Sequence, residues 1–144
     1  VEEEALRVAD VVRDRARVFG REDWNAPVAS GSNPADAMVV CPCSMGTLAA
    51  IAHGLSDNLI ERAADVMLKE QRKLILVPRE APFSTLHLEN MLTLSRMNAV
   101  ILSANPRFHH RPKTVDALFH FTAALSLGQL RIPHTLMARW GDDR

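Results

Sequence analysis

Residues 37–82 read AMVVCPCSMGTLAAIAHGLSDNLIERAADVMLKEQRKLILVPREAP, and two short apolar runs within this stretch decide the fold. The runs at 37–41 and 73–78 are rich in valine, leucine and isoleucine, which is typical of strands buried on both faces. Between them, 44–53 and 59–71 carry helical signals. Strand, helices and strand in this order predict neighbouring parallel strands joined by right-handed crossovers.

Turn and capping residues set the expected boundaries of these elements. Pro42 is expected to end the first strand, because proline cannot donate to a strand ladder. Ser44 can cap the helix that follows, and Gly54 can stop it. Asn58 with Glu61 three residues later resembles a capping box for the second helix.

Two more helices and one more strand follow in the sequence. A helix is expected at 84–97, a strand at 99–102 and a last helix at 114–127, which Thr114 can cap. The alternation predicts an α/β fold of the three-layer Rossmann or flavodoxin-like kind, a parallel sheet with helices on both faces. Three strands are few for such a sheet. We therefore expect N-terminal strands to be missing from this chain, or copies of the chain to share surfaces.

The composition fits one domain over residues 1–144 and excludes several classes of protein. The 17 Lys and Arg balance the 17 Asp and Glu, so there is no basic excess to indicate nucleic-acid binding. No apolar run is long enough to span a membrane. Cys41 and Cys43 are too close for an easy disulfide, and an isolated C-x-C predicts no metal site. Reduced cysteines without a signal peptide indicate the cytoplasm.

Ligands of open α/β sheets bind beyond the carboxyl ends of the strands, which points to the three segments 41–47, 78–82 and 103–112. In the first, backbone N–H groups and the hydroxyls of Ser44 and Thr47 could hold a phosphate or the polar edge of a ring. The alternative is an ordinary serine-capped helix.

The second segment places Arg79 next to Glu80 just after a strand. Arginine offers a rigid fork for an anion, and a desolvated glutamate can act as an acid or base. The alternative is a surface ion pair of little energetic value.

Other charged residues have simpler interpretations. Arg62 and Lys69 are seven residues apart, so they share one face of the predicted helix, and the charge pattern alone favours a solvated stripe. His109 and His110 form a basic tip of the third segment that could meet a phosphate, and no metal is expected there.

Read in order, these segments resemble the UbiX-type flavin prenyltransferases, including the B subunits of phenolic-acid decarboxylase systems. The resemblance covers roughly residues 28–112, with a weaker match at the C-terminal tail. The matching text is Ala29-Ser30-Gly31-Ser32, CPCSMGTLAAIAHGLSDNLIERAADVMLKE at 41–70, LVPREAP at 76–82, HLENML at 87–92, HRPKT at 110–114 and Ala138-Arg139-Trp140.

The resemblance implies that the protein transfers a dimethylallyl group from dimethylallyl phosphate to reduced FMN and supplies the prenylated FMN to a UbiD-type decarboxylase. It also implies a homo-oligomer, often a dodecamer. The implied FMN contacts are Ser44, Met45, Gly46, Thr47 and Arg79. The implied catalytic residues are Glu80, Lys69 and Arg62, and the implied phosphate contacts are Lys69, Arg79 and His109.

Three departures from the family pattern accompany the resemblance. The glycine- and serine-rich FMN loop after the family's first strand is absent. His109 stands where the family has a tyrosine that donates to the phosphate. Leu125 stands where the family has an arginine on the last helix, and leucine cannot bind phosphate. These departures keep two alternatives open, a non-prenylating FMN-binding or accessory subunit and a paralogue that retains only the scaffold.

Overall fold

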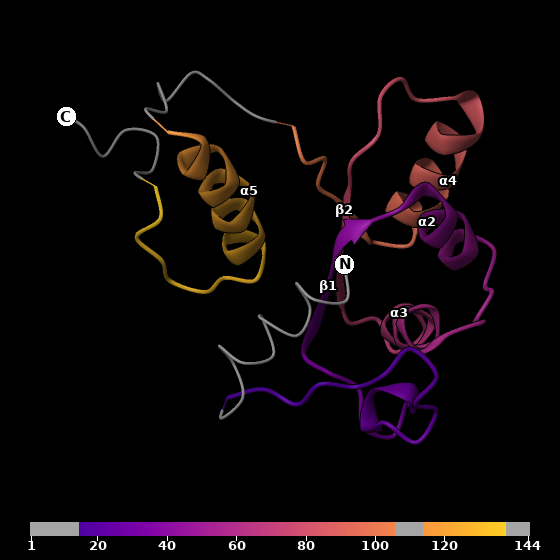
Figure 1. Ribbon diagram of the computed structural model, residues 1–144. Helices are drawn as coiled ribbons and strands as arrows, with labels where there is room; N and C mark the ends of the chain where they lie inside the picture. Colours follow the sequence, from indigo (N-terminus) through magenta and orange to yellow (C-terminus); the bar gives the residue numbers. More distant parts are fainter. Residues whose placement is uncertain (1–14, 106–113, 138–144) are drawn as a thin grey trace.

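The computed structural model describes residues 15–105 and 114–137 (Figure 1). Strands and helices alternate along the chain, as the sequence predicts. In chain order the elements are η1 (Pro27–Ala29), β1 (Ala37–Cys43), α2 (Met45–Ala52), α3 (Leu59–Lys69), β2 (Lys73–Pro78), α4 (Thr85–Arg96), β3 (Val100–Ile101) and α5 (Val115–Gln129).

The described strands form one parallel sheet in the order β1-β2-β3. Val39 is the partner of Ile75, and Ile75 is also the partner of Val100, so β2 lies in the middle. The expected end of β1 was wrong, because the strand continues through Pro42 to Cys43. The register shifts between Val40 and Cys43, and this irregularity accommodates a residue that has no N–H to donate.

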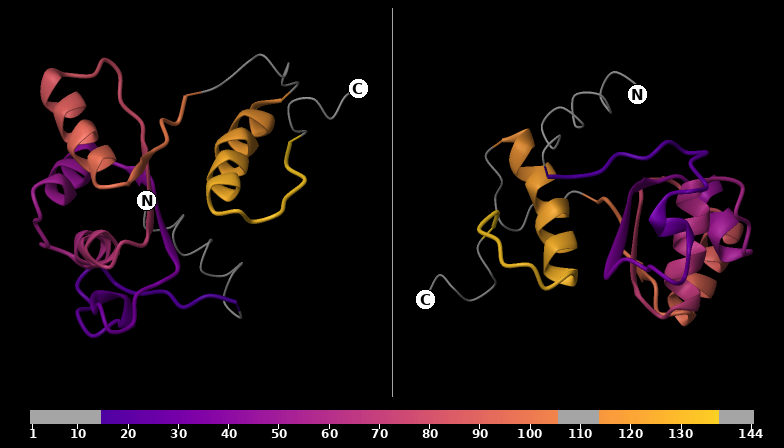
Figure 2. Two further views of the ribbon diagram at one scale, coloured as in Figure 1. Left: turned by 180° about the vertical axis from the view of Figure 1, so that it is seen from behind. Right: turned by 90° about the horizontal axis from the view of Figure 1, so that it is seen from below.

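Helices α2, α3 and α4 cover one face of the sheet, whereas α5 lies on the opposite side and stands away from the strands (Figures 1 and 2). The α/β fold class predicted from the sequence is therefore confirmed. The core between the three helices and the sheet is one cluster of buried apolar side chains: Val40, Cys43, Leu48, Ile51, Ala64, Met67, Leu74, Leu76, Leu94 and Ala99.

Side chains of β2 are buried on both faces of the sheet. Leu74 and Leu76 belong to the cluster under α2, α3 and α4, while Ile75 and Val77, which alternate with them, are equally buried. At the beginning of this strand, Lys73 donates a hydrogen bond to Gln129 of α5, with 3.2 Å between Nζ and Oε1.

The predicted caps are present. The side chains of Ser44 and Thr114 accept hydrogen bonds from the third residue of their helices. Asn58 caps α3 through the N–H groups of Ile60 and Glu61. The Glu61 carboxylate accepts from the N–H of Asp57 rather than Asn58, so the reciprocal bond is displaced by one residue from a capping box.

Within the described ranges 15–105 and 114–137, no helix has both the length and the hydropathy that crossing a membrane requires.

The packing of α4 yields a first prediction. The side chain of Leu94 is 0% exposed and contacts the core, whereas Ser95 is exposed. We expect Leu94→Ala to lower the free energy of unfolding by about 2–5 kcal/mol, because it leaves a cavity. Ser95→Ala, the matched control, is expected to change it by about 0.5 kcal/mol or less. Urea denaturation followed by circular dichroism measures both, and equal losses would contradict the assignment of Leu94 to the core.

Candidate functional site

The segments after β1 and β2 leave the sheet side by side. Cys43 and Pro78 are partners in the sheet, so Ser44 and Arg79, the next residue of each strand, emerge at the same edge. After β3 the chain continues alongside β2, since the Ala104 N–H donates to the Pro78 carbonyl at 3.0 Å. The structure therefore brings the first two predicted segments and the start of the third, residues 103–105, to one edge, whereas the rest of the third segment, with His109, lies outside the described residues.

The N-terminus of α2 is open to a ligand. Ser44 caps the helix by accepting the N–H of Thr47 at 3.1 Å, and its hydroxyl donates to the Thr47 hydroxyl at 3.0 Å or accepts from it. A Cβ placed on Gly46 would meet no atom closer than the Ser44 Oγ, at 3.8 Å, so the space above the first turn is free. The first-turn N–H groups and the positive end of the helix dipole favour an anionic or carbonyl oxygen here.

Arg79 and Glu80 do not pair with each other. No hydrogen bond or ion pair joins Arg79 to any other residue that the structure describes, and the Glu80 carboxylate accepts the N–H of Ala81 at 3.1 Å. Both side chains are exposed. The alternative of a surface ion pair therefore does not hold, and the Arg79 guanidinium is available for an anion.

Lys69 lies at the opposite edge of the sheet. It is the last residue of α3 and precedes the beginning of β2, whereas Arg79 follows the end of β2. The six residues of this strand span roughly 20 Å. The structure therefore does not bring Lys69 of one chain to Arg79 or Glu80 of the same chain.

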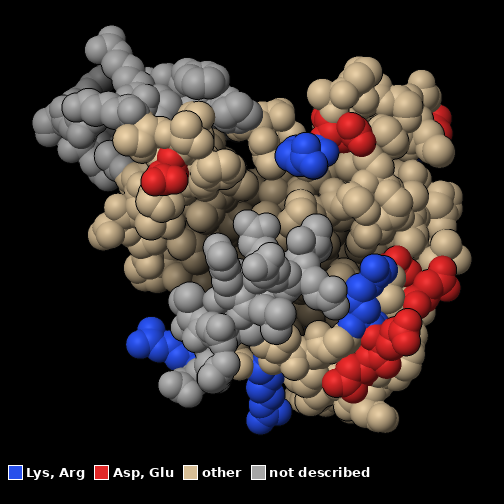
Figure 3. Space-filling view, viewed as in Figure 1, with Lys and Arg blue, Asp and Glu red and all other residues tan. Residues whose placement is uncertain are grey.

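Arg62 holds the loop at 29–32 against α3, and the Lys69 side chain lies next to Gly31 of the same loop. The Arg62 Nε donates to the Ala29 carbonyl at 2.9 Å, and its guanidinium pairs with Asp65, also at 2.9 Å. Lys69 pairs with Glu70, and a Cβ placed on Gly31 would overlap the ends of both side chains. Figure 3 shows acidic and basic side chains next to one another over this side of the molecule, in place of a patch of one sign.

Sequence reasoning missed the role of Gly31 in this contact. A side chain at this position would require the ends of Lys69 and Glu70 to move, because the loop backbone passes close to both. The signal in the sequence was the small-residue run Ala29-Ser30-Gly31-Ser32, but its partner on α3 could not be read from spacing.

The two cysteines differ in environment. Burial raises the pKa of the Cys43 thiol to about 11, and this side chain belongs to the core cluster. Cys43 therefore stays protonated at neutral pH and does not act as a nucleophile. Cys41 is exposed at the end of β1. No cluster of three or more His, Cys, Asp or Glu that could hold a metal ion occurs within 15–105 and 114–137.

Comparison with known proteins identifies the family. The Flavoprotein family model matches residues 2–125. A flavin prenyltransferase UbiX from Methanocaldococcus jannaschii is 50% identical over 123 residues, which are 85% of this chain and 67% of the relative. The chain belongs to the UbiX-type flavoproteins.

A UbiX from Pseudomonas aeruginosa is 60% identical over 126 residues, 88% of this chain. The chain spans 60% of the length of that relative. Solved UbiX structures share the fold. The dodecameric FMN-dependent UbiX-like decarboxylase from Escherichia coli O157:H7 has a TM-score of 0.86 and 48% identity over 91% of this chain and 71% of that one. AnUbiX in complex with FMN and dimethylallyl pyrophosphate has a TM-score of 0.87 and 43% identity over 92% of this chain and 71% of that one.

The pair formed by Lys69 and Glu70 yields a second prediction. The hydrogen bond and charge of Lys69 lower the pKa of the Glu70 carboxyl. A carboxyl whose pKa is lowered by folding stabilises the folded state at pH values above its unfolded pKa. That stabilisation is lost as the pH falls through the folded pKa. We expect Lys69→Gln to raise the pKa of the Glu70 carboxyl. An NMR titration that detects the carboxyl carbon measures this pKa. Arg96→Gln, on α4, is the control and leaves this pKa unchanged; an unaltered pKa in Lys69→Gln would contradict the pairing.

Proposed function

We propose that this protein is a flavin prenyltransferase, which transfers a dimethylallyl group from dimethylallyl phosphate to reduced FMN. The observation that carries the proposal is Arg79, which has no partner among the residues that the structure describes and lies beside the open N-terminus of α2, at the edge where three strands end. The relatives named flavin prenyltransferase, and the related structure that contains FMN with dimethylallyl pyrophosphate, support it.

The first turn of α2 fits the polar parts of FMN. In the proposal, the flavin edge or its phosphate binds to hydroxyl and N–H groups of Ser44, Met45, Gly46 and Thr47. This turn is accessible, and Gly46 leaves free space above it. The flavin supplies the nucleophile when bound. The residues of this chain bind it, orient it and keep the second substrate beside it.

Cleavage of dimethylallyl phosphate leaves the bonding electron pair on the departing phosphate. A guanidinium stabilises that charge, and Arg79 has no other partner within the described ranges. Glu80 follows directly and is the proton acceptor of the proposal, with one carboxylate oxygen held by the N–H of Ala81. His109 remains a proposed phosphate contact.

We further propose that each site is built from two copies of the chain. Lys69 belongs to the set of phosphate contacts that the family resemblance implies, yet it lies at the far end of β2 from Arg79. Lys69 of one copy can meet Arg79 of another only across an interface of a homo-oligomer. Exposed apolar side chains on α4, namely Leu86, Leu88 and Leu92, offer surface for such contacts, and one related structure is dodecameric.

Prenylated FMN is the product of this reaction, and its recipient in the proposal is a UbiD-type decarboxylase. Two free cysteines fit a reducing compartment, and we propose the cytoplasm.

A second candidate is a non-prenylating FMN-binding or accessory subunit of a decarboxylase system. The observation that favours it is Leu125, a partly buried apolar residue of α5 where the family resemblance requires an arginine. An accessory subunit would bind FMN, co-purify with a larger partner and show no turnover.

A turnover assay tests the proposed reaction. Incubation with reduced FMN and dimethylallyl phosphate is expected to give prenylated flavin, identified by mass. Arg79→Gln is expected to lower the rate about a hundredfold, because the departing charge loses its partner, and Glu80→Gln should do so by a similar factor. Arg96→Gln, at the last residue of α4 and near the beginning of β3, is the control. Recovery of unmodified FMN alone from the unaltered protein would exclude prenylation.

Complementation tests the shared site. Lys69→Gln and Arg79→Gln are each expected to retain only about a hundredth of the native activity when expressed alone. Suppose that the two variants are co-expressed in equal amounts, that their copies mix at random, and that each site takes Lys69 and Arg79 from different chains. About a quarter of the sites would then contain both native residues. We expect about a quarter of the native activity. No recovery, with mixed assembly verified by mass spectrometry, would contradict a site shared in this way.

A further inference from the structure

A loop at residues 79–84 joins the end of β2 to the beginning of α4 and carries Arg79 and Glu80. Every residue of this loop is exposed. Among the described residues, a single hydrogen bond joins two members of the loop, from the Ala81 N–H to the Glu80 carboxylate. Because neither burial nor a hydrogen-bond network fixes the loop, its conformation depends on how its two ends are held.

The two ends are held in different ways. Pro78 is buried and pairs with Cys43 in the sheet, so the core fixes the first end. The second end is Ser84, which caps α4. Its hydroxyl accepts the His87 N–H at 3.2 Å, and the His87 Nδ1 accepts the Ser84 N–H at 3.3 Å. The result is a capping box in which a histidine takes the place of the usual glutamate or glutamine.

A histidine closes such a box only at some pH values. Its Nδ1 accepts a hydrogen bond while it is unprotonated, and both ring nitrogens become donors when the imidazole gains a proton, which happens between about pH 8 and 5. A protonated His87 therefore cannot accept the Ser84 N–H. It also places a positive charge in the first turn of α4, where the helix dipole disfavours cations. Both effects open the box.

The surroundings of His87 do not offset this charge. The side chain is half-buried on the inner face of α4, which also carries the buried Asn90 and Leu94. Helix α2 and strand β3 pack against α4, and neither contains a titratable residue, so neither supplies a carboxylate for a protonated imidazole. The charged groups come from the loop and from α4 itself: Arg79, Glu80, Glu89 and Arg96.

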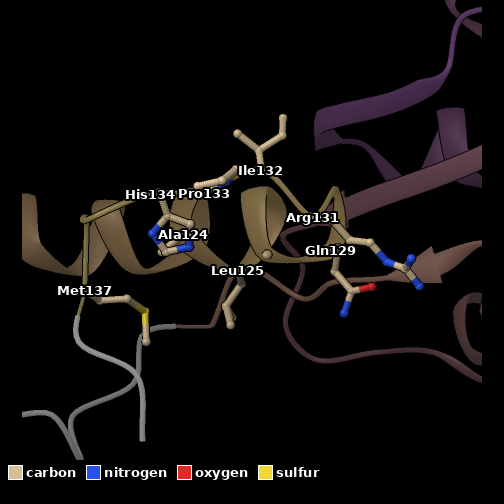
Figure 4. A pocket seen from close by; sticks show the side chains of 9 residues that line it. Ala124, Leu125, Gln129, Arg131, Ile132, Pro133, His134 and Met137 are labelled. Atoms are coloured by element: carbon tan, nitrogen blue, oxygen red, sulfur yellow. The ribbon is translucent and has the colours of Figure 1, made fainter. Parts of the chain in front are cut away.

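Of the histidines that the structure describes, His87 alone bonds to this loop. His53 is exposed at the C-terminal end of α2, and His120 belongs to α5. His134 lines a cavity of about 490 Å³ at the C-terminal end of α5, together with Leu125 (Figure 4). Since α5 lies on the opposite side of the sheet from α4, these histidines do not reach the box.

We propose that His87 is a positioning residue for the 79–84 loop. Its neutral imidazole closes the capping box and holds Arg79 and Glu80 at the edge of the sheet, and protonation opens the box and loosens that hold. The effect on catalysis rests on the proposed function, because Arg79 and Glu80 act in that reaction. The opening of the box does not depend on prenylation.

Hydrogen–deuterium exchange tests the box in the full chain without substrate. Mass spectrometry of a peptide covering residues 84–92 gives the exchange rates of native protein and His87→Gln at pH 7.5 and 5.5. Comparing the two proteins at one pH cancels the intrinsic pH dependence of exchange. We expect equal rates at pH 7.5. At pH 5.5 the native peptide is expected to exchange about fivefold faster, because glutamine still accepts the Ser84 N–H.

Turnover tests the positioning role. The substrate phosphate itself gains a proton near pH 6, so kcat/KM for dimethylallyl phosphate is compared between variant and native protein at the same pH. His87→Gln is expected to match the native value at pH 7.5 and to exceed it about fivefold at pH 5.5. His87→Leu, which cannot accept, is expected to be about fivefold below native at pH 7.5 and equal to it at pH 5.5.

His53→Gln is the matched control, and it is expected to follow the native protein at both pH values in both experiments. Equal exchange in native protein and His87→Gln at pH 5.5 would overturn the proposal. Faster native exchange with a kcat/KM ratio that does not change with pH would reduce His87 to a helix cap and overturn its positioning role. The expected exchange with no prenylated flavin at any pH would refute the proposed function and leave the pH-dependent box intact.

Discussion

Strand β2 and its two parallel neighbours are the interaction on which the rest of the structure depends. Leu74 and Leu76 face the core beneath three helices, and Ile75 and Val77 are buried on the other side. Because β2 pairs with β1 and β3 in parallel, the three strands end at one edge. The open N-terminus of α2 and Arg79 lie at that edge for this reason.

The same strand separates the charged residues into two groups. Arg79 and Glu80 follow its end, whereas Lys69 and Arg62 belong to α3, the helix that leads to its beginning. A helix that crosses back over a parallel sheet must carry its last residues to the opposite edge. A single chain therefore divides the residues that the family resemblance groups together, which makes association of copies part of the proposed chemistry.

Hydrogen bonds and ion pairs distinguish structural residues from ligand-binding ones. Arg62 and Lys69 both have partners within the chain, and Arg62 fastens the 29–32 loop to α3. Arg79 has no partner among the described residues. An arginine without a partner among the described residues adds little to folding, which favours a binding role for Arg79.

The order of strands and helices, the limits of β2 and the caps at Ser44, Asn58 and Thr114 could be predicted from the sequence, because apolar runs and caps act over a few residues. That the segments after β1 and β2 leave the sheet at the same edge was predictable too, since the carboxyl ends of parallel strands lie together. Four features were not predictable: β1 continues through Pro42, Gly31 lies against Lys69, Lys69 is far from Arg79, and a cavity lies beside Leu125. Each depends on which distant segments pack together, and that is decided only when the whole chain has folded.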